Sequence, residues 1–231
     1  MTPLSVIIPT LDEERHLPGL LPVLVEAGAQ VIVADGGSSD RTVAAARAVG
    51  GVHVVQAGRP RAAQMNAGAA RAAGDVLLFL HADARPPPGF PGLIGQALAD
   101  PDAVGGAFEL AIDDERTAAR LVAWGANLRT RITGRPYGDQ GIFVRRAVFA
   151  ALGGFAPLPF MEDLEFSGRL RRRGKVKLVR PPVLVSARRW RAQGYARTTY
   201  RNTVVAACYY LGIDTSPLAH WAEPHRDAER P

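Results

Sequence analysis

The stretch Ser5–Glu14, SVIIPTLDEE, is a short apolar run that turns abruptly polar and acidic. Similar apolar runs recur along the first half, with alanine-rich segments between them. They are continuously apolar rather than alternating, which indicates strands covered on both faces. The predicted strands are Ser5–Pro9, Gln30–Asp35, Val52–Gln56 and Val76–His81. The predicted helices are Glu13–Glu26, Asp40–Val49 and Ala62–Ala73. This strand–helix alternation predicts an α/β fold with a mostly parallel central sheet flanked by helices.

Polar or glycine-rich groups follow three of these strands, in the segments Thr10–Glu13, Asp35–Ser38 and His81–Asp83. Ligands of open parallel sheets bind at the carboxyl ends of the strands. The sequence therefore predicts a ligand site along one edge of the sheet.

The second half is less regular, and it carries most of the arginines. Its expected strands are Ala103–Ile112, Val176–Val179 and Val183–Ser186. Its expected helices are Pro91–Ala99, Glu115–Arg131, a helix opened by Met161 and Tyr195–Leu211. Residues 1–216 are expected to form a single Rossmann-like domain, followed by a polar tail over residues 217–231.

Composition limits the classes of protein that fit this chain. Its 231 residues are 47% hydrophobic and 22% charged, which suits one buried core. The single cysteine, Cys208, excludes an internal disulfide and suits a reducing cytoplasm. No stretch reaches the roughly 18 apolar residues of a membrane span, so we expect a cytoplasmic protein, at most peripheral to the inner face of the membrane. The net charge of +6 reflects either arginine-rich composition alone or an anionic partner.

Three acidic positions suggest chemistry, although each alone also fits an ordinary strand end or helix cap. Asp35 emerges from a strand into glycines and can accept hydrogen bonds from a base or ribose. Asp83 can bind Mg²⁺ or Mn²⁺, which would bridge it to diphosphate oxygens. Asp163 can act as a general base, with Glu162 beside it.

These motifs together resemble those of the family 2 glycosyltransferases, which have the GT-A fold. The resemblance covers about residues 4–190 and begins with Ser5–Glu14. It continues through Asp35–Asp40, Asn66–Gly68, Gly74–Asp75, His81–Asp83 and Glu162–Asp163, in the family's order. Within the family, Gln64–Ala69, Phe79–Asp83, Pro136–Gly141 and Ser186–Trp190 are most similar to a small bacterial subfamily. That subfamily is known as the arsenosugar-biosynthesis or selenium-associated glycosyltransferases.

The resemblance implies a role for each matched residue. The residues expected to bind the nucleotide-sugar donor are Pro9, Thr10, Glu13, Asp35, Arg61, Asn66, His81 and Asp83. Asp83 would also bind the metal, Asp163 would be the catalytic base, and Glu162 would support acceptor binding. The residues expected near the acceptor or diphosphate are Asp139, Gln140, Arg189 and Trp190. The implied reaction moves a sugar from a UDP-sugar to a small-molecule or lipid-linked acceptor, with inversion.

This sequence departs from the family pattern in three respects. His81 replaces the first acid of the Asp-X-Asp motif, and imidazole is a poor ligand for Mg²⁺. Gly36 replaces the usual second acid after Asp35. The long C-terminal membrane segments of processive members are absent from this sequence, which argues against polymer synthesis across a membrane.

Other interpretations stay open at this point. A nucleotidyltransferase shares this type of half-fold, but the acidic turn Thr10–Glu13 argues against its phosphate loop. A nucleic-acid-binding module fits the charge, but the arginines are scattered and no binding motif appears. A catalytically silent sugar-nucleotide sensor is compatible with His81. The final helix suits packing on the core or a homodimer, and also a peripheral membrane contact.

Overall fold

The apolar runs of the first half form neighbouring parallel strands in the computed structural model, which describes residues 3–213, 215–218 and 221. These strands are β1 (Leu4–Thr10), β2 (Gln30–Asp35), β3 (Val52–Gln56) and β4 (Val76–Phe79). The remaining strands are β5 (Ala84–Arg85), β6 (Ala103–Asp113), β7 (Ile142–Arg145) and β8 (Lys175–Ser186). Among the described residues they form one sheet with the order β3-β2-β1-β4-β7-β6-β8-β5. Only β7 and β5 run against the common direction, so the predicted mostly parallel sheet is confirmed.

Period-two alternation along the strands divides the core into two layers. In β1, Val6 and Ile8 point to one face of the sheet, and Ile7 points to the other. The first face is covered by α1 (Leu17–Glu26) and α4 (Phe90–Ala97). The opposite face is covered by α3 (Arg61–Ala69), α6 (Arg146–Ala151) and α7 (Glu162–Arg173). Burial on both faces explains why these strands are continuously apolar.

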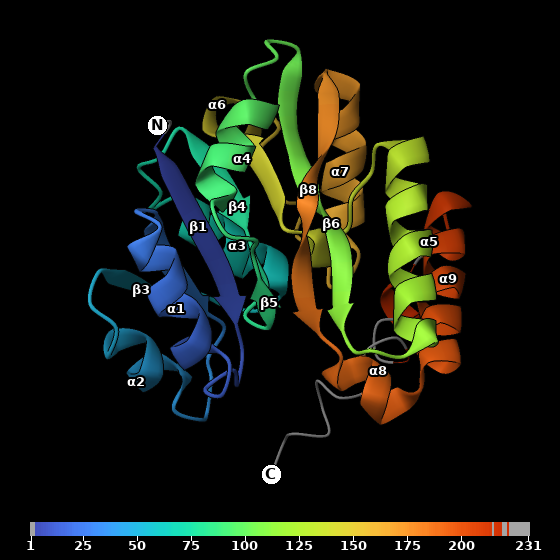
Figure 1. Cartoon of the computed structure of the whole chain (residues 1–231), viewed down its shortest axis with the longest axis horizontal. Helices are drawn as coiled ribbons and strands as arrows, with labels where there is room; N and C mark the ends of the chain where they lie inside the picture. The colour runs from blue at the N-terminus through green and yellow to red at the C-terminus, as the bar shows by residue number, and fades with distance from the viewer. Residues whose placement is uncertain (1–2, 214, 219–220, 222–231) are drawn as a thin grey trace.

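The remaining helices lie at the margins of the sheet. They are α2 (Thr42–Arg47), α5 (Thr117–Thr133), α8 (Arg188–Gln193) and α9 (Tyr195–Tyr210), with 3₁₀ turns η1 (Gly138–Gln140) and η2 (Ser216–Leu218). Helices α5 and α9 pack side by side beyond the long strands β6 and β8, and α8 crosses below the strand ends (Figure 1). No helix in the part of the chain that the structure describes is long and apolar enough to cross a membrane.

One long strand replaces the two short strands predicted over residues 176–186. Two prolines, Pro181 and Pro182, suggest a break, yet β8 continues through them. The pairing with β6 slips between Phe108 and Leu110, opposite this proline pair. Because the other neighbour, β5, pairs only with Leu184 and Val185, few ladder bonds are lost where prolines lack an N–H. The short helices α6 and α8 were not predicted, since six residues carry too weak a periodic signal.

Candidate active site

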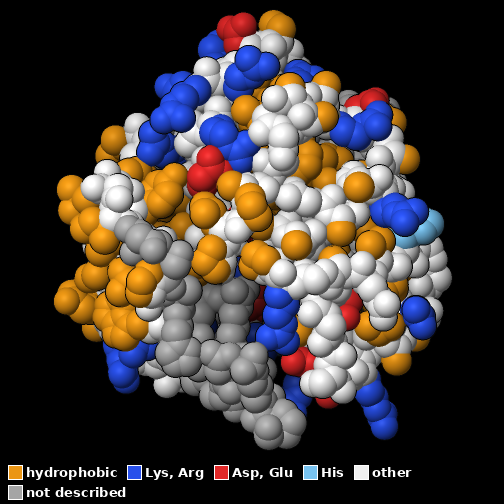
Figure 2. All heavy atoms as spheres, turned by 180° about the vertical axis from the view of Figure 1, so that it is seen from behind, with side chains coloured by type: hydrophobic (Ala, Val, Ile, Leu, Met, Phe, Trp, Pro, Cys, Tyr) orange, Lys and Arg blue, Asp and Glu red, His pale blue; other side chains and the backbone are white. Residues whose placement is uncertain are grey.

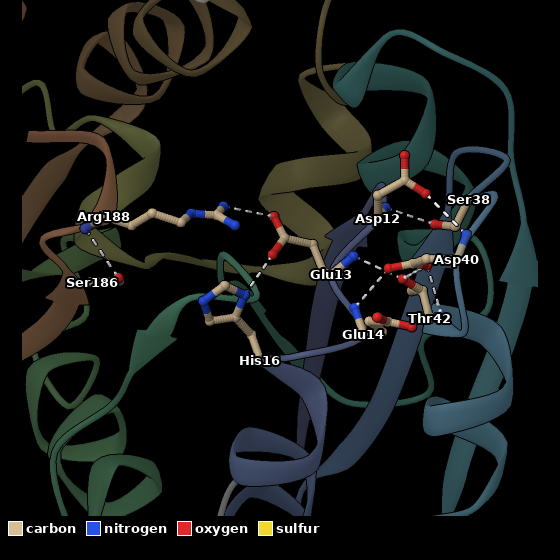
Figure 3. Close-up of polar contacts among 9 residues, drawn as sticks. All are labelled: Asp12, Glu13, Glu14, His16, Ser38, Asp40, Thr42, Ser186 and Arg188. Carbon is tan, nitrogen blue, oxygen red and sulfur yellow. Dashed lines mark hydrogen bonds and ion pairs between the residues drawn. The ribbon is translucent and has the colours of Figure 1, made fainter. Parts of the chain in front are cut away.

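Two loops at the carboxyl edge of the sheet are joined by hydrogen bonds from backbone N–H groups to side chains. Asp12, after β1, adopts a left-handed φ of 55°. Its backbone N–H donates to Ser38 Oγ at 3.0 Å, and its Oδ1 accepts from the Ser39 N–H at 2.7 Å. This reciprocal pairing joins the loop after β1 to the loop after β2 (Figure 3).

The next turn of the same loops repeats this arrangement. The Glu13 N–H donates to Thr42 Oγ1 at 2.7 Å, and the Glu14 N–H donates to Asp40 Oδ2 at 3.1 Å (Figure 3). Asp40 Oδ1 accepts from the N–H of Thr42, the first residue of α2, at 2.8 Å, but the N-cap position of this helix is Arg41. Burial acts to raise the pKa of Asp40, but hydrogen bonds, chiefly those from Thr42, lower it below its usual value. The acidic groups of these loops therefore serve to fix the loop geometry.

Asp35 lies at the end of β2 with only 1% of its surface exposed. Its Oδ2 accepts from the N–H groups of Gly37 and Ser38, both at 3.0 Å. Its Oδ1 accepts from Ser38 Oγ at 2.5 Å and from Thr10 Oγ1 at 3.3 Å. These contacts make Asp35 the internal support of its loop.

Glu13 connects this first half to the second. Its carboxylate contacts His16 Nδ1 at 2.7 Å and Arg188 Nη2, from α8, at 3.5 Å; Figure 3 shows both side chains pointing at it. Asp83 lies near this group, in the turn between β4 and β5. Burial and the nearby charge of Glu13 raise the pKa of Asp83, while Arg188 opposes the shift. A cation at Asp83 would relieve both causes.

Asp163 and His81 meet in a small pocket on the side of the sheet opposite α1. The Asp163 carboxylate accepts from the Gly138 N–H at 2.6 Å and from the Leu164 N–H at 2.7 Å. A Cβ added at Gly138 would lie 3.0 Å from His81 Nε2 and 3.1 Å from Asp163 Oδ2. The pocket is lined by Pro9, Arg61, Met65, Phe79, Leu80, His81, Gly138, Ile142, Phe155, Glu162 and Asp163. It therefore brings together predicted residues from β1, α3, β4 and α7.

Glu162 lies deeper than Asp163, with 3% of its surface exposed. Arg61 Nη1, at the start of α3, lies 3.7 Å from Glu162 Oε1. This ion pair joins a predicted donor-binding residue to a predicted acceptor-binding residue. Removing Arg61 would take one positive charge away from the nearly fully buried carboxylate of Glu162.

The two neighbouring residues Asp139 and Gln140 have different surroundings. The Gln140 side chain is fully buried, where Oε1 accepts from Thr130 Oγ1 at 2.8 Å and Nε2 donates to the Phe108 carbonyl at 3.3 Å. Asp139 is partly exposed, and burial with the nearby Asp163 raises its pKa to about 6, against the attraction of Arg129. Asp139 is therefore the member of this pair with access to a bound ligand.

Three other predicted residues have structural contacts. Asn66 donates to the Phe155 carbonyl and accepts from the Phe155 N–H, both at 2.9 Å, and so fixes the wall of the pocket. Trp190 belongs to the core at 8% exposure and stacks on Tyr195. Arg189 Nη2 donates to Asn202 at 3.1 Å, and its charge also acts on Asp139. Of Arg189 and Trp190, it is therefore Arg189 whose charge acts on an acidic group of the site.

Asp83, in the turn between β4 and β5, suits a divalent metal that is held mainly by substrate phosphates. Mg²⁺ in phosphate-handling sites is commonly held by one or two carboxylates together with substrate phosphates. Asp83 supplies such a carboxylate, and its raised pKa is of the kind that a bound cation reverses. Among residues 3–213, 215–218 and 221, no group of three or more His, Cys, Asp or Glu is placed to hold a metal ion.

Some contributors were missed by the sequence analysis. His16 and the guanidinium of Arg129 carry no motif, and their place at the site follows from the turn after β1 and from the packing of α5. The backbone N–H of Gly138 is also invisible to residue-type arguments. The glycine itself was the available signal, because a side chain there would crowd His81 and Asp163.

The fold and this site together define a glycosyltransferase of the GT-A type. The family described as "Glycosyl transferase family 2" matches residues 5–152, which is more than half of the chain, and the chain belongs to that family. No curated protein matches the sequence.

Solved structures share the fold at low sequence identity. A mannosyltransferase from Pyrobaculum calidifontis, in complex with GDP-Man and Mn²⁺, has a TM-score of 0.68 at 20% identity, covering 97% of this chain and 70% of that one. S. aureus TarS 1–349 has a TM-score of 0.60 at 18% identity, covering 80% of this chain. Glucosyl-3-phosphoglycerate synthase from Mycobacterium tuberculosis, with Mn²⁺ and UDP-Glc, has a TM-score of 0.56 at 18% identity, covering 92% and 80%. The matched region spans 60% of the TarS chain.

Proposed function

We propose that this glycosyltransferase moves a sugar from a UDP-sugar to a small-molecule or lipid-linked acceptor, with inversion and with Mg²⁺ or Mn²⁺. The observation that carries the proposal is the orientation of Asp163. Two backbone N–H groups hold its carboxylate at the pocket that also contains His81. A carboxylate fixed in this way is positioned to accept a proton from a hydroxyl group in the pocket.

The chemistry follows from that position. Asp163 would take the proton of the acceptor hydroxyl as its oxygen attacks the anomeric carbon of the sugar. The bond between that carbon and the diphosphate oxygen breaks, and its electron pair leaves with the diphosphate. Because attack and departure occur on opposite faces, the product has inverted configuration. Glu162 and Arg61 would hold the reacting groups in the orientation needed for attack.

Asp83 would hold the Mg²⁺ or Mn²⁺ ion, whose chemistry is to neutralise charge on the departing diphosphate. Arg188 pairs with Glu13, and the charge of Arg189 acts on Asp139. Both arginines would therefore add positive charge to the same region. The preference for UDP is supported by the family resemblance and by the UDP-Glc complex of the mycobacterial synthase, whereas the archaeal mannosyltransferase binds GDP-Man. Membership of the arsenosugar-associated subfamily stays a prediction that identification of the acceptor would test.

The direct test is calorimetric titration of the whole chain with UDP, GDP and dTDP, each with Mn²⁺, Mg²⁺ or EDTA. We expect UDP to bind with a metal-dependent affinity. In Asp83→Asn the metal-dependent part of the affinity should fall by about tenfold or more, since one anionic ligand is lost. Folded protein that binds none of the three nucleotides would contradict the proposal.

Asp75 provides the matched control, because it lies next to the opposite end of β4 and pairs with Arg146 at the surface. Asp75→Asn makes the same chemical change beyond the other end of this strand, so it should leave nucleotide binding unchanged. If Asp75→Asn and Asp83→Asn weakened binding equally, the effect would reflect net charge rather than a metal ligand.

A further inference from the structure

Helix α5 has its large and small side chains on unexpected faces. Its buried residues are the small Ala119, Ala123 and Thr130. Its outward face carries large apolar residues instead: Leu121 is 62% exposed, Trp124 64% and Ile132 76%, and Leu128 lies between them. The spacing of these four residues follows the helical repeat, so they form one stripe. A helix that only covered the core would have the opposite distribution.

Exposed large hydrophobic residues also occur on the neighbouring helix α9 (Tyr195–Tyr210) and just after it. The described residues at α9 include Tyr200, Tyr210, Leu211 and Ile213, which are also exposed large hydrophobics. Helices α5 and α9 are in contact, and hydrophobic side chains gather on this side of the molecule, at the left of Figure 2. We call this surface the α5–α9 face. Contiguous apolar surfaces of this kind mark sites of interaction.

Charge around the face selects between the possible partners. Helix α5 contains three arginines and α9 contains two, and neither helix contains an Asp or Glu residue. Arg120 and Arg197 are exposed beside the apolar stripe. A second copy of the chain would bring a like-charged face against this one, which is unfavourable. An anionic lipid surface instead offers apolar depth for the large side chains and phosphate groups for the arginines.

We propose that the α5–α9 face docks on an anionic lipid surface. Trp124 suits the boundary between headgroups and acyl chains, where indole rings are enriched. The leucine and isoleucine side chains on either side would enter the outer part of the hydrocarbon layer. Docking itself does not depend on the proposed sugar transfer.

A consequence for the acceptor does rest on the proposed function. Helix α5 runs directly into the segment 134–141, which contains Gly138 and Asp139. Docking through α5 would therefore attach the acceptor side of the pocket to the membrane. This arrangement favours a lipid-linked acceptor, which would reach Asp163 by diffusion within the membrane.

The test is co-sedimentation of the full chain with phosphatidylcholine vesicles, with or without phosphatidylglycerol, in the absence of any donor. We expect binding only to the anionic vesicles, weakened by salt. The double variant Trp124→Ser/Ile132→Ser should bind at least tenfold more weakly, because it removes two exposed apolar groups. Arg120→Glu/Arg197→Glu should also weaken binding, through charge alone. Circular dichroism and nucleotide titration would verify that the variants remain folded.

Val23→Ser is the matched control, since Val23 is a 49% exposed hydrophobic residue on the distant helix α1. It should bind vesicles as the unmodified chain does. Wild-type protein that stays in the supernatant would overturn the proposal, as would equal binding by the double variant. A dimer in sedimentation equilibrium that Trp124→Ser/Ile132→Ser dissolves, without vesicle binding, would assign the face to a second copy. Because nucleotide binding is measured separately, loss of the donor site cannot be mistaken for loss of docking.

Discussion

Carboxylates follow the strand ends in both halves of the sheet, but their surroundings differ. In the loops after β1 and β2, Asp12, Asp35 and Asp40 accept hydrogen bonds from nearby N–H and hydroxyl groups. The hydrogen bonds lower the pKa of Asp40. Toward the second half, Asp83 and Asp139 lie near other acids, and burial raises the pKa of each.

The difference separates acids that support the loops, which we call structural acids, from acids with a role in the proposed chemistry, which we call chemical acids. Hydrogen-bond donors from the protein stabilise the ionised form and fix the loop in one shape. Burial beside other carboxylates disfavours the ionised form of an acid. Acids with this free-energy cost are typical of sites that bind a cation or a proton. In the proposed function, the first group would build the surface for the nucleotide, and the second group would meet the metal, the sugar and the acceptor.

The largest expected effect comes from removing the proposed base. Asp163→Asn should reduce turnover by roughly 100- to 10,000-fold, because the amide cannot accept the proton of the acceptor. The rate of release of nucleoside diphosphate from the sugar nucleotide measures it, with water as the acceptor if no other is known. Nucleotide affinity and melting temperature should change little. Near-normal turnover in this variant would remove Asp163 from the role of base.

A smaller effect is expected when the base is displaced rather than removed. Gly138→Ala would place a methyl group 3.0 Å from His81 Nε2 and 3.1 Å from Asp163 Oδ2. The carboxylate must then shift by a few tenths of an ångström, which we expect to cost about 10- to 100-fold in kcat. Gly125→Ala, in the open on α5, is the matched control and should leave kcat unchanged. Equal kcat values for the two variants would show that the position of Asp163 is not critical.

Replacing Asp35 should mainly lower stability, whereas replacing Asp163 should mainly lower turnover. Asp35→Ala removes the acceptor for the N–H groups of Gly37 and Ser38 in a buried loop. We expect a loss of about 1–3 kcal/mol in the free energy of unfolding, since buried donors are left unsatisfied. Urea denaturation measures it, and Asp163→Asn in the same experiment should lose much less. If both variants lost the same stability, the division between structural and chemical acids would be wrong.

The sequence predicted the first-half strands well because β1, β2 and β4 are almost fully buried and helices separate them along the chain. The parallel pairing of β1 with β2 and β4 agrees with that prediction. The path of β8 through Pro181 and Pro182 was not predictable, because it depends on the irregular pairing with β6. The outward apolar stripe of α5 was also missed. The helical spacing of apolar residues predicts a helix, but it does not tell which face of the helix is exposed.

Residue types identified the acids of the site, but they did not distinguish the roles of these acids. Asp35 and Asp83 look alike in sequence, as acids that end an apolar strand. Only the structure shows that the first accepts backbone donors of its own loop and that the second lies beside Glu13. Similarly, Gln140 and Trp190 matched the motif, yet their side chains are buried in contacts that depend on tertiary packing.

The smallest effect concerns the proton on Asp139. Its pKa of about 6 in the folded protein exceeds the usual 3.8, so the folded state binds more protons between these values. Stability should therefore fall as the pH rises from about 4 to about 6. Asp139→Asn should stabilise the protein by about 1–2 kcal/mol at pH 7, less than the full shift implies, because the side chain is partly exposed.

Urea denaturation of both proteins across this pH range measures the difference, which should vanish below about pH 4, where Asp139 is protonated in both states. Asp102→Asn, at an exposed carboxylate that pairs with Lys175, is the control and should show no such gain at neutral pH. A constant difference at every pH would indicate that Asp139→Asn changes packing rather than charge. A difference that shrinks when UDP and Mn²⁺ are added would show that the ligand compensates the same charge, which is expected only if Asp139 belongs with the chemical acids.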